Sequence, residues 1–369
     1  MFLFAKVYQK IREDKVMVSL NKINFTAALV ALFAVAALGV AEGRAAELGK
    51  TLDEVKARAK TEAKLQLAVT WRKKLRKALT KAIKKNTGVK IKVTRVRGLG
   101  SRERILNESI GGVNKFDLVN VSGELREQYK KAGAIVKVPY RSYFPKLDAE
   151  TFSPDGYFAA TGFSKYGILY NTKLVPKDQI PTGWDDCISP RWKGNVGIMT
   201  RPRAFTALWA GWGREKSLAF HRKLKANKPV WSSGNTDTGT KVAIGEFHIA
   251  CGMGLHALIN VKRRDPTAPL AFVMPKDLPI QVGEALALMK GAKSPNSAIL
   301  VVGFLASPKG QAYYYLQGRS SPFVKGSKSW NMLKKSGAKP VWGGWEASGK
   351  AEAEASGEII QAWGFPKAR

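Results

Sequence analysis

A polar segment follows the first predicted strand, where free backbone N–H groups and side chains could hold a small ligand. Thr70 and Trp71 come directly after an apolar strand expected over residues 65–70. In open α/β sheets, ligands lie outside the carboxyl ends of the strands, where loops lead into helices. Trp71 could therefore stack on a ligand or act as a lid, and the alternative is a tryptophan packed in the core at a strand end.

A glycine-rich turn follows the second predicted strand, which we expect over residues 90–96. It contains Gly98, Gly100, Ser101 and Arg102, and a helix is expected to start near Glu103. The turn is similar to a dinucleotide fingerprint, but Glu103 stands where the third glycine would be, so we do not expect a nucleotide cofactor there. Ser101 is predicted to cap the helix, and the turn could also form a cradle for an anion or a carboxylate.

Further polar loops follow strands predicted in the second half of the chain. Arg201 and Arg203 come after a strand ending at residue 199, and their guanidinium groups would suit an acidic ligand or be solvated. Asn235 and Thr236 belong to a Ser/Asn/Thr-rich run that leads into a helix. Tyr166 lies near the predicted crossing between the two halves and is a further candidate contact.

The residue types do not favour catalysis. The chain has only three histidines, and it contains no serine nucleophile elbow and no P-loop. His248, Cys251 and His256 are near one another in sequence, but a structural zinc site needs a fourth ligand, and none is apparent nearby. We therefore expect no catalytic residue, no metal and no cofactor. Cys187 and Cys251 could pair in an exported protein, or they could be two separate buried thiols.

The charge balance is strongly basic. Lys and Arg number 62 against 28 Asp and Glu, a net charge of +34, while 45% of the residues are hydrophobic. Such a charge attracts polyanions, including phospholipid headgroups, nucleic acid and acidic ligands. The alternative is a solvated basic surface, because the charges recur at helical spacings along most of the chain.

The N-terminal segment is typical of a secretory signal. An unbroken apolar run covers residues 25–40, with basic residues before it and small residues after it. It is shorter than the roughly 20 residues that span a bilayer. We expect a signal peptide over residues 1–46, with either Met1 or Met17 as the true start, and a mature protein in the periplasm.

The rest of the chain is predicted to alternate helix and strand. Helices are expected over residues 52–63, 72–86, 205–212, 217–224, 296–305, 310–316 and 351–363, with a helix end at 241–245. Strands are expected over 65–70, 90–96, 116–121, 157–163, 166–170, 195–199, 247–251, 270–273 and 284–289, the last two returning to the first half of the fold. This alternation favours parallel strands with helices between them, an α/β fold.

Three motifs in the middle of the chain carry a resemblance. Residues 170–175 read Tyr-Asn-Thr-Lys-Leu-Val, residues 181–186 read Pro-Thr-Gly-Trp-Asp-Asp, and residues 190–194 read Pro-Arg-Trp-Lys-Gly. Gly245-Glu246 and the Ser-Pro-Lys-Gly-Gln motif at 307–311 follow downstream. Together they resemble bacterial extracellular solute-binding proteins of the ferric-iron, thiamine and phosphonate group, over about residues 50–325.

The resemblance implies a two-lobe periplasmic-binding-protein fold of type II, with a hinge and an interlobe cleft. One lobe is expected to comprise residues 47–160 plus about 270–320, and the other residues 161–269 plus about 321–369. The implied function is the periplasmic component of an ABC importer, a non-enzymatic monomer that captures a small solute and delivers it to a membrane permease. The Arg, Ser, Thr and Asn residues of the candidate loops predict an organic anion or another small polar organic solute. In this family the loop around Asn235 also contributes ligand contacts.

An alternative is a basic envelope-surface or polyanion-binding protein that reuses the same fold. Under either interpretation an anionic membrane surface is a candidate partner, and no specific nucleic acid is expected.

The chain departs from the iron-binding members of this group. Those members carry adjacent tyrosines after the Gly-Glu motif, whereas residues 247–257 contain no tyrosine here. Tyr313, Tyr314 and Tyr315 lie on a helix expected to pack away from the cleft. We therefore do not expect a ferric ion to be held by a tyrosine pair.

Overall fold

The structure is a computed structural model that describes residues 47–347 and 350–365. The predicted signal peptide and the choice between Met1 and Met17 lie outside these residues. Within the described ranges, no helix has both the length and the apolar character needed to cross a membrane.

The first lobe is built on three parallel strands, β1 (Leu65–Val69), β2 (Ile91–Arg95) and β3 (Leu118–Val121). β1 lies in the middle and pairs with the other two. Parallel neighbours need long crossover connections, which α4 (Lys73–Thr87) and α5 (Gly100–Ile110) supply. The three strands therefore all end at the same edge of the sheet.

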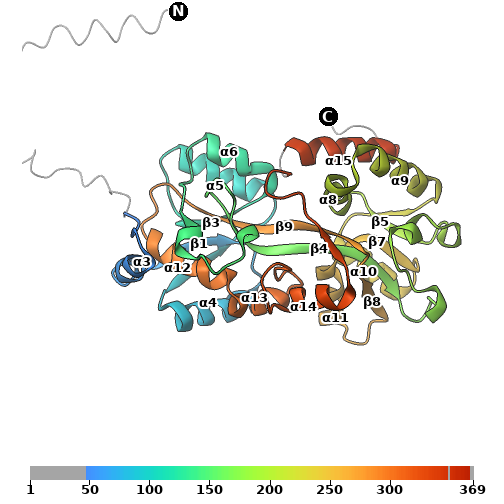
Figure 1. The fold of residues 1–369 in the computed structure, drawn as a ribbon, viewed down its shortest axis with the longest axis horizontal. Helices are drawn as coiled ribbons and strands as arrows, with labels where there is room; N and C mark the ends of the chain where they lie inside the picture. The colour runs from blue at the N-terminus through green and yellow to red at the C-terminus, as the bar shows by residue number, and fades with distance from the viewer. Residues whose placement is uncertain (1–46, 348–349, 366–369) are drawn as a thin grey trace, which may run out of the picture. The chain divides into compact units, whose positions relative to one another are not determined.

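Helices cover both faces of these strands (Figure 1). Leu65, Leu67 and Val69 of β1 pack in the cluster that contains α4 and α12 (Pro295–Ala306), while Ala68 packs in the cluster of α5 and α6 (Arg126–Lys131). α4 buries an apolar stripe spaced every four residues and ends where Gly88 adopts a φ of 75°. Its lysines face solvent, as expected for an amphipathic surface helix. The remaining helices of this lobe are α3 (Leu52–Ala59), α7 (Tyr140–Tyr143) and α13 (Pro308–Tyr315).

Two long antiparallel strands connect the lobes, β4 (Ala159–Asn171) and β9 (Asp277–Leu288) (Figure 1). β9 pairs with β3 at its carboxyl end, and β4 turns from β9 to β7 at Tyr166. The two strands predicted at residues 157–163 and 166–170 are thus one continuous strand. Register shifts near Gly162 bend it, as bulges do.

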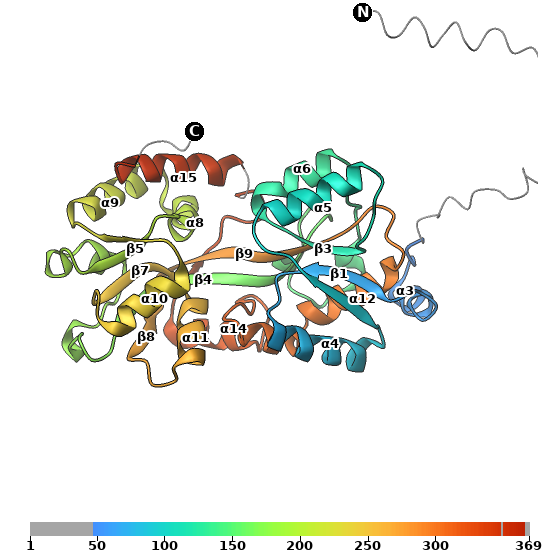
Figure 2. The same cartoon turned by 180° about the vertical axis from the view of Figure 1, so that it is seen from behind.

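The second lobe repeats the pattern of parallel strands joined by helices. Its strands are β5 (Val196–Met199), β6 (Val230–Ser232) and β7 (Ile249–Gly254). Its helices are α8 (Arg203–Trp212), α9 (Arg214–Ala226), α10 (Asn235–Ile244) and α11 (Leu255–Arg264). α10 and α11 pack on one face of the sheet and α8 and α9 on the other (Figure 2).

Cys187 and Cys251 form a disulfide, with Cα atoms 6.1 Å apart. It joins the short 3-10 turn Trp184–Ile188 to β7. Of the two alternatives that the sequence left open, the structure therefore has the paired cysteines.

The chain ends on segments that contact both lobes. α14 (Lys328–Ser336) lies against α13, and β10 (Lys339–Val341) pairs with the start of β9. Trp342 and Trp345 then donate to Glu150 of the first lobe, while α15 (Lys350–Ala362) packs on α8 and α9 of the second.

Most predicted elements are present, and a few differ. α6, α7, β6, α11, α14 and β10 were not predicted. β8 (Leu270–Val273) does not return to the first lobe, because it pairs with the end of β4 that also pairs with β7. β4 and β9 belong to both lobes, so the predicted lobe boundaries at residues 160 and 270 stay predictions.

Candidate functional site

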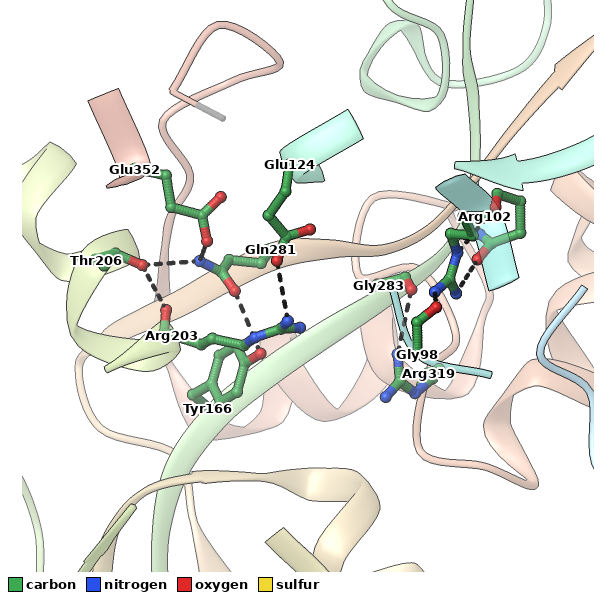
Figure 3. A network of polar contacts seen from close by, with 11 residues as sticks. Gly98, Arg102, Glu124, Tyr166, Arg203, Thr206, Gln281, Gly283, Arg319 and Glu352 are labelled. Carbon is green, nitrogen blue, oxygen red and sulfur yellow. Dashed lines mark hydrogen bonds and ion pairs between the residues drawn. The ribbon is translucent and has the colours of Figure 1, made fainter. Parts of the chain in front are cut away.

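The loops at the carboxyl ends of the strands in the two lobes lie close together, and two contacts join them. Arg203, at the start of α8, donates to Oε1 of Glu124, which follows β3, at 3.2 Å (Figure 3). Arg72, which follows β1, donates to Oδ1 of Asn260 on α11 at 3.2 Å. A hollow of about 60 Å³, partly open to solvent, lies beside the Arg203–Glu124 pair and is lined by both lobes. The two lobes therefore enclose a cleft.

A buried carboxylate on β9 holds the loop after β1. Glu284, which is 3% exposed, accepts from Trp71 Nε1 and Thr161 Oγ1 at Oε1, both at 3.1 Å, and from Thr70 Oγ1 at Oε2, also at 3.1 Å. The hydroxyl of Tyr314 donates to the same carboxylate. Trp71 is 1% exposed, so its ring lies in the core and does not form a lid. Tyr314 is 2% exposed and lies behind this loop, where it also accepts from Trp71 Nε1 at 3.3 Å.

The glycine-rich loop after β2 is held by its own lobe. α5 begins at Gly100, after Leu99, so Ser101 lies inside the helix and is not the N-cap that we expected. Its hydroxyl donates to the carbonyl of Arg97. Arg102 is 9% exposed and donates to the carbonyl of Gly98 and to both oxygens of Asn120 (Figure 3). Arg102 thus ties the loop to β3, and burial lowers the pKa of its guanidinium.

Arginines from both lobes gather at this edge. Burial lowers the pKa of Arg72, and the positive charges of Arg263, Arg95, Arg264 and Arg319 lower it further. Arg95 ends β2, Arg263 and Arg264 end α11, and Arg319 follows α13, where it donates to the carbonyl of Gly283 at 3.3 Å (Figure 3). The groups that act on Arg72 are all cations, so this part of the cleft is strongly electropositive.

The floor of the cleft is polar where the hinge strands cross. Tyr166, on β4, donates its hydroxyl to Oε1 of Gln281 on β9 at 3.3 Å. The amide of Gln281 in turn donates to Thr206 of α8 and to Glu352 of α15, both at 3.0 Å (Figure 3). Burial raises the pKa of the Glu352 carboxyl. Gln281 therefore connects a hinge strand to two helices of the second lobe.

The predicted residues of the second lobe differ in whether their side chains make hydrogen bonds within the site. Asn235 begins α10 and accepts from the backbone N–H of Gly254 at 2.9 Å, and Thr236 accepts from Asn260 Nδ2 at 3.2 Å. Since Asn260 also accepts from Arg72, Thr236 is linked to the first lobe. Arg201 is exposed, whereas Arg203 makes the interlobe contact.

His256, the second residue of α11, lies within reach of the cationic groups of the cleft. It is 8% exposed, and its Nδ1 atom is buried without a hydrogen-bond partner in the described structure. Burial holds the pKa of the imidazole well below its usual value, and the charges of Arg319, Lys165, Arg72 and Arg203 depress it further. His256 is therefore neutral at pH 7.

The histidine and cysteine side chains near β7 do not form a metal site. Cys251 is bonded to Cys187, so it has no thiolate to offer a metal. Across the described ranges, no three His, Cys, Asp or Glu side chains form a group that could hold a metal ion.

Several residues of the site were not among the sequence candidates. Arg72 directly follows a candidate, so an extension of that loop by one residue would have included it. Asn260 and His256 lie on α11, a helix that was not predicted. Arg319 follows a helix and Glu284 lies within a strand. The sequence candidates were polar residues in loops directly after predicted strands, so neither residue was identified.

Comparisons with known proteins agree with this architecture. Residues 114–350 match the family model described as "Bacterial extracellular solute-binding protein". An uncharacterized protein of Haemophilus influenzae is 30% identical over 164 residues, which cover 42% of this chain. The match spans only 46% of that curated relative, about half of its length.

The similar solved structures include ferric-binding proteins, such as that of Campylobacter jejuni, with a TM-score of 0.63 and 18% identity, over 82% of this chain and 100% of its own. The Trichodesmium protein IdiA (FutA), in complex with iron and citrate, has a TM-score of 0.68 and 19% identity, over 82% of this chain and 100% of its own. The periplasmic binding protein AfuA of Actinobacillus pleuropneumoniae, with fructose-6-phosphate bound, has a TM-score of 0.59 and 19% identity, over 81% and 97%. At this identity the likeness shows the fold alone, and it confirms the predicted two-lobe fold. Given the match to the family model, the chain belongs to the bacterial extracellular solute-binding protein family.

Proposed function

We propose that this protein is the periplasmic solute-binding component of an ABC importer that captures a small anionic organic solute between its lobes. The observation that carries the proposal is the convergence of guanidinium groups from both lobes on one cleft. Arg72 and Arg319 come from the side of the first lobe, and Arg203 and Arg263 from the second. Guanidinium groups bind phosphate and carboxylate groups through two parallel hydrogen bonds.

The carboxylates near these arginines leave most of the positive charge uncompensated. Glu284 is occupied by donors from Trp71, Thr161, Thr70 and Tyr314. Glu124 pairs with Arg203, and both side chains are more than half exposed, at 56% and 52%. Such an exposed pair contributes about 0–1 kcal/mol. An anionic solute can therefore replace Glu124 as the partner of Arg203 at small cost.

Two buried nitrogen atoms at this edge of the cleft lack partners among the described residues, namely Arg95 Nε and His256 Nδ1. Buried polar groups in native proteins are nearly always hydrogen-bonded, to the protein, to water or to a ligand. A polar solute in the cleft could accept from the Arg95 N–H and pair with His256 Nδ1, which accepts or donates according to the imidazole tautomer. This supports a solute with several oxygen atoms over an apolar one.

The residues favour an organic anion over a bare ferric ion. No tyrosine occurs in residues 247–257, and Tyr314 is occupied by a buried carboxylate. Several of the similar structures are ferric-binding proteins, but one was solved with citrate as well as iron and one with fructose-6-phosphate. Both molecules are polyoxygenated organic anions, the chemical class that we propose for this chain.

In the proposed mechanism the lobes close about β4 and β9 on the solute, and the closed form is recognised by a membrane permease. Closure requires that the solute bind the closed state more tightly than the open one. Arginines from both lobes supply such a difference, because Arg72 and Arg203 can bind one solute together only when the lobes are close. In this mechanism the protein acts as a non-enzymatic monomer, since no chemical step is needed and one chain supplies both lobes of the site.

The proposal is tested by thermal unfolding of the secreted protein against sugar phosphates, dicarboxylates and uncharged sugars, each at low and raised salt. A solute at one hundred times its Kd stabilises the native state by about 2.7 kcal/mol. We expect a salt-resistant stabilisation by one organic anion, which Arg72→Gln abolishes and Arg222→Gln on the exposed face of α9 preserves. Equal loss in both variants, or stabilisation by uncharged sugars alone, contradicts an anion site at Arg72.

The alternative function, polyanion binding in place of solute capture, makes a different prediction. Binding to a polyanion weakens steeply as salt rises, because it releases counterions. A protein that no small solute stabilises, and that binds polyanions only at low salt, would use its charge and not its cleft.

A further inference from the structure

The first lobe carries lysines at the end opposite to the cleft. Lys64 stands directly before β1, and Lys90 directly before β2. Because the strands are parallel, their first residues lie at one edge of the sheet and their last residues at the other. Arg72 and Arg95 are at the carboxyl edge, which faces the cleft. The lysines are therefore separated from the solute site by the length of the strands.

These lysines surround two adjoining hollows of the surface. Lys60, Lys64 and Lys90 line the first hollow. Lys64, Lys92 and Lys293 line the second. All five side chains are exposed, and we refer to Lys60, Lys64, Lys90, Lys92 and Lys293 together as the basic end.

The carboxylates at the basic end are already used by the backbone. Glu62 accepts from the backbone N–H groups of Asn296 and Ser297 at the start of α12, at 2.9 and 2.6 Å. Asp117 accepts from the N–H groups of Gln66 and Lys293, both at 2.7 Å. Among the ion pairs of the described residues, none includes a lysine of the basic end. The five lysines outnumber these two carboxylates, so this surface carries net positive charge.

We propose that the basic end docks the protein on an anionic phospholipid surface, with lysine ammonium groups against lipid phosphates. Clusters of lysines bind anionic headgroups without fixed geometry, because each ammonium is a compact point charge. This differs from the cleft, where arginines present planar groups suited to one bound molecule. Docking by the basic end leaves the cleft free, since the two lie at opposite edges of the sheet.

This surface has few aromatic rings on which nucleic acid bases could stack, which supports a membrane over a nucleic acid. Among the residues that line the two hollows, Phe116 is the one aromatic side chain, and it is half-buried. The exposed large hydrophobic side chains of the described residues are Leu, Ile and Val, and none is aromatic. Single-stranded nucleic acid is usually bound by aromatic platforms together with positive charge. The surface offers the charge without the platforms.

The test is sedimentation of protein secreted to the periplasm with vesicles of phosphatidylcholine alone or mixed with phosphatidylglycerol, at low and raised salt. The test variant replaces Lys64, Lys90, Lys92 and Lys293 with glutamine. The control makes the same change in charge on the second lobe, at exposed positions Lys173, Lys177, Lys193 and Lys262. Thermal unfolding and solute binding are measured for both variants, so that a folding defect or a failed solute site is recognised separately.

We expect the protein to bind only the anionic vesicles and to lose that binding as salt rises. A lysine near an anionic bilayer contributes roughly fivefold to the partition constant. The test variant should therefore lose at least about tenfold, while the control stays within about threefold of the unchanged protein.

Three results would overturn the proposal. They are equal losses in the two variants, absence of binding to anionic vesicles, and tighter binding of an oligonucleotide by the same four lysines.

Discussion

Glu284 provides a direct test of how the cleft is built. Its carboxylate accepts four hydrogen bonds, from Trp71, Thr70, Thr161 and Tyr314, and it is 3% exposed. Three of these donors meet Oε1 and only Thr70 meets Oε2. Substitutions at this position can therefore keep the size of the side chain while removing some or all of its ability to accept hydrogen bonds.

Two substitutions of similar size should give different results. In Glu284→Gln the amide oxygen can take the place of Oε1 and keep three acceptor contacts, at a cost of about 1 kcal/mol for the weaker neutral bonds. In Glu284→Leu all four donors lose their acceptor. Trp71 Nε1 and Thr161 can partly turn to the hydroxyl of Tyr314, which they already approach at 3.3 and 3.0 Å. A buried donor left without an acceptor costs about 1–3 kcal/mol, so the leucine variant should lose about 3 kcal/mol in all.

The assay is equilibrium unfolding in urea at pH 7, with tryptophan fluorescence as the readout. The midpoint should shift slightly for glutamine and strongly for leucine, with an unchanged denaturant slope. If the leucine variant is as stable as the glutamine variant, the donors do not depend on Glu284. The account of how Thr70 and Trp71 are positioned would then be wrong.

Three further predictions concern parts of the molecule outside this network. The disulfide between Cys187 and Cys251 closes a loop with a sequence separation of 64, so its reduction should cost about 4 kcal/mol, measured by unfolding with and without reductant; an unchanged midpoint would contradict this. Burial lowers the pKa of His221 to about 3, so the unfolded chain takes up the proton first as the pH falls. The stabilisation from His221 is complete above its unfolded pKa of 6.5 and is lost toward pH 3. The loss of this stabilisation should lower the unfolding free energy by about 2 kcal/mol between pH 6.5 and 5. The dependence of the unfolding free energy on pH should be weaker in His221→Asn. Glu124→Gln should change stability by less than about 1 kcal/mol yet raise the affinity for the solute in a titration, because the carboxylate no longer competes for Arg203; a lower affinity would refute the competition.

Strong local patterns made much of the fold predictable. The alternation of buried strands and amphipathic helices over residues 52–121 corresponds to β1, β2 and β3 with α4 and α5 between them. β6 has three residues and β10 has three, too few to form a recognisable period. α11 was missed because its apolar residues directly continue those of β7, and the change from strand to helix occurs at Gly254 without a side-chain cap. The pairing of β8 depends on tertiary contacts, which periodicity does not record.

The candidate site was only partly predictable, because strand ends indicate where a loop lies and not which way its side chains turn. Trp71 and Arg102 were candidates on equal grounds with Arg203. In the structure Trp71 and Arg102 turn inward to buried partners, while Arg203 reaches the opposite lobe. The direction depends on partners distant in sequence. Glu284, the partner of Trp71, is separated from it by 213 residues, and no local pattern relates the two.

The net charge of +34 is another feature whose role cannot be predicted from the sequence alone. Composition predicts affinity for anions but does not say whether a solute or a surface is bound. Strand direction makes the distinction, because Lys64 and Lys90 precede β1 and β2 whereas Arg72 and Arg95 lie at their carboxyl ends. Residues that are close in the sequence therefore lie at opposite edges of one sheet. Charge that is spread along the chain thus becomes two separate surfaces, with guanidinium groups inside the cleft and ammonium groups on the exposed far edge.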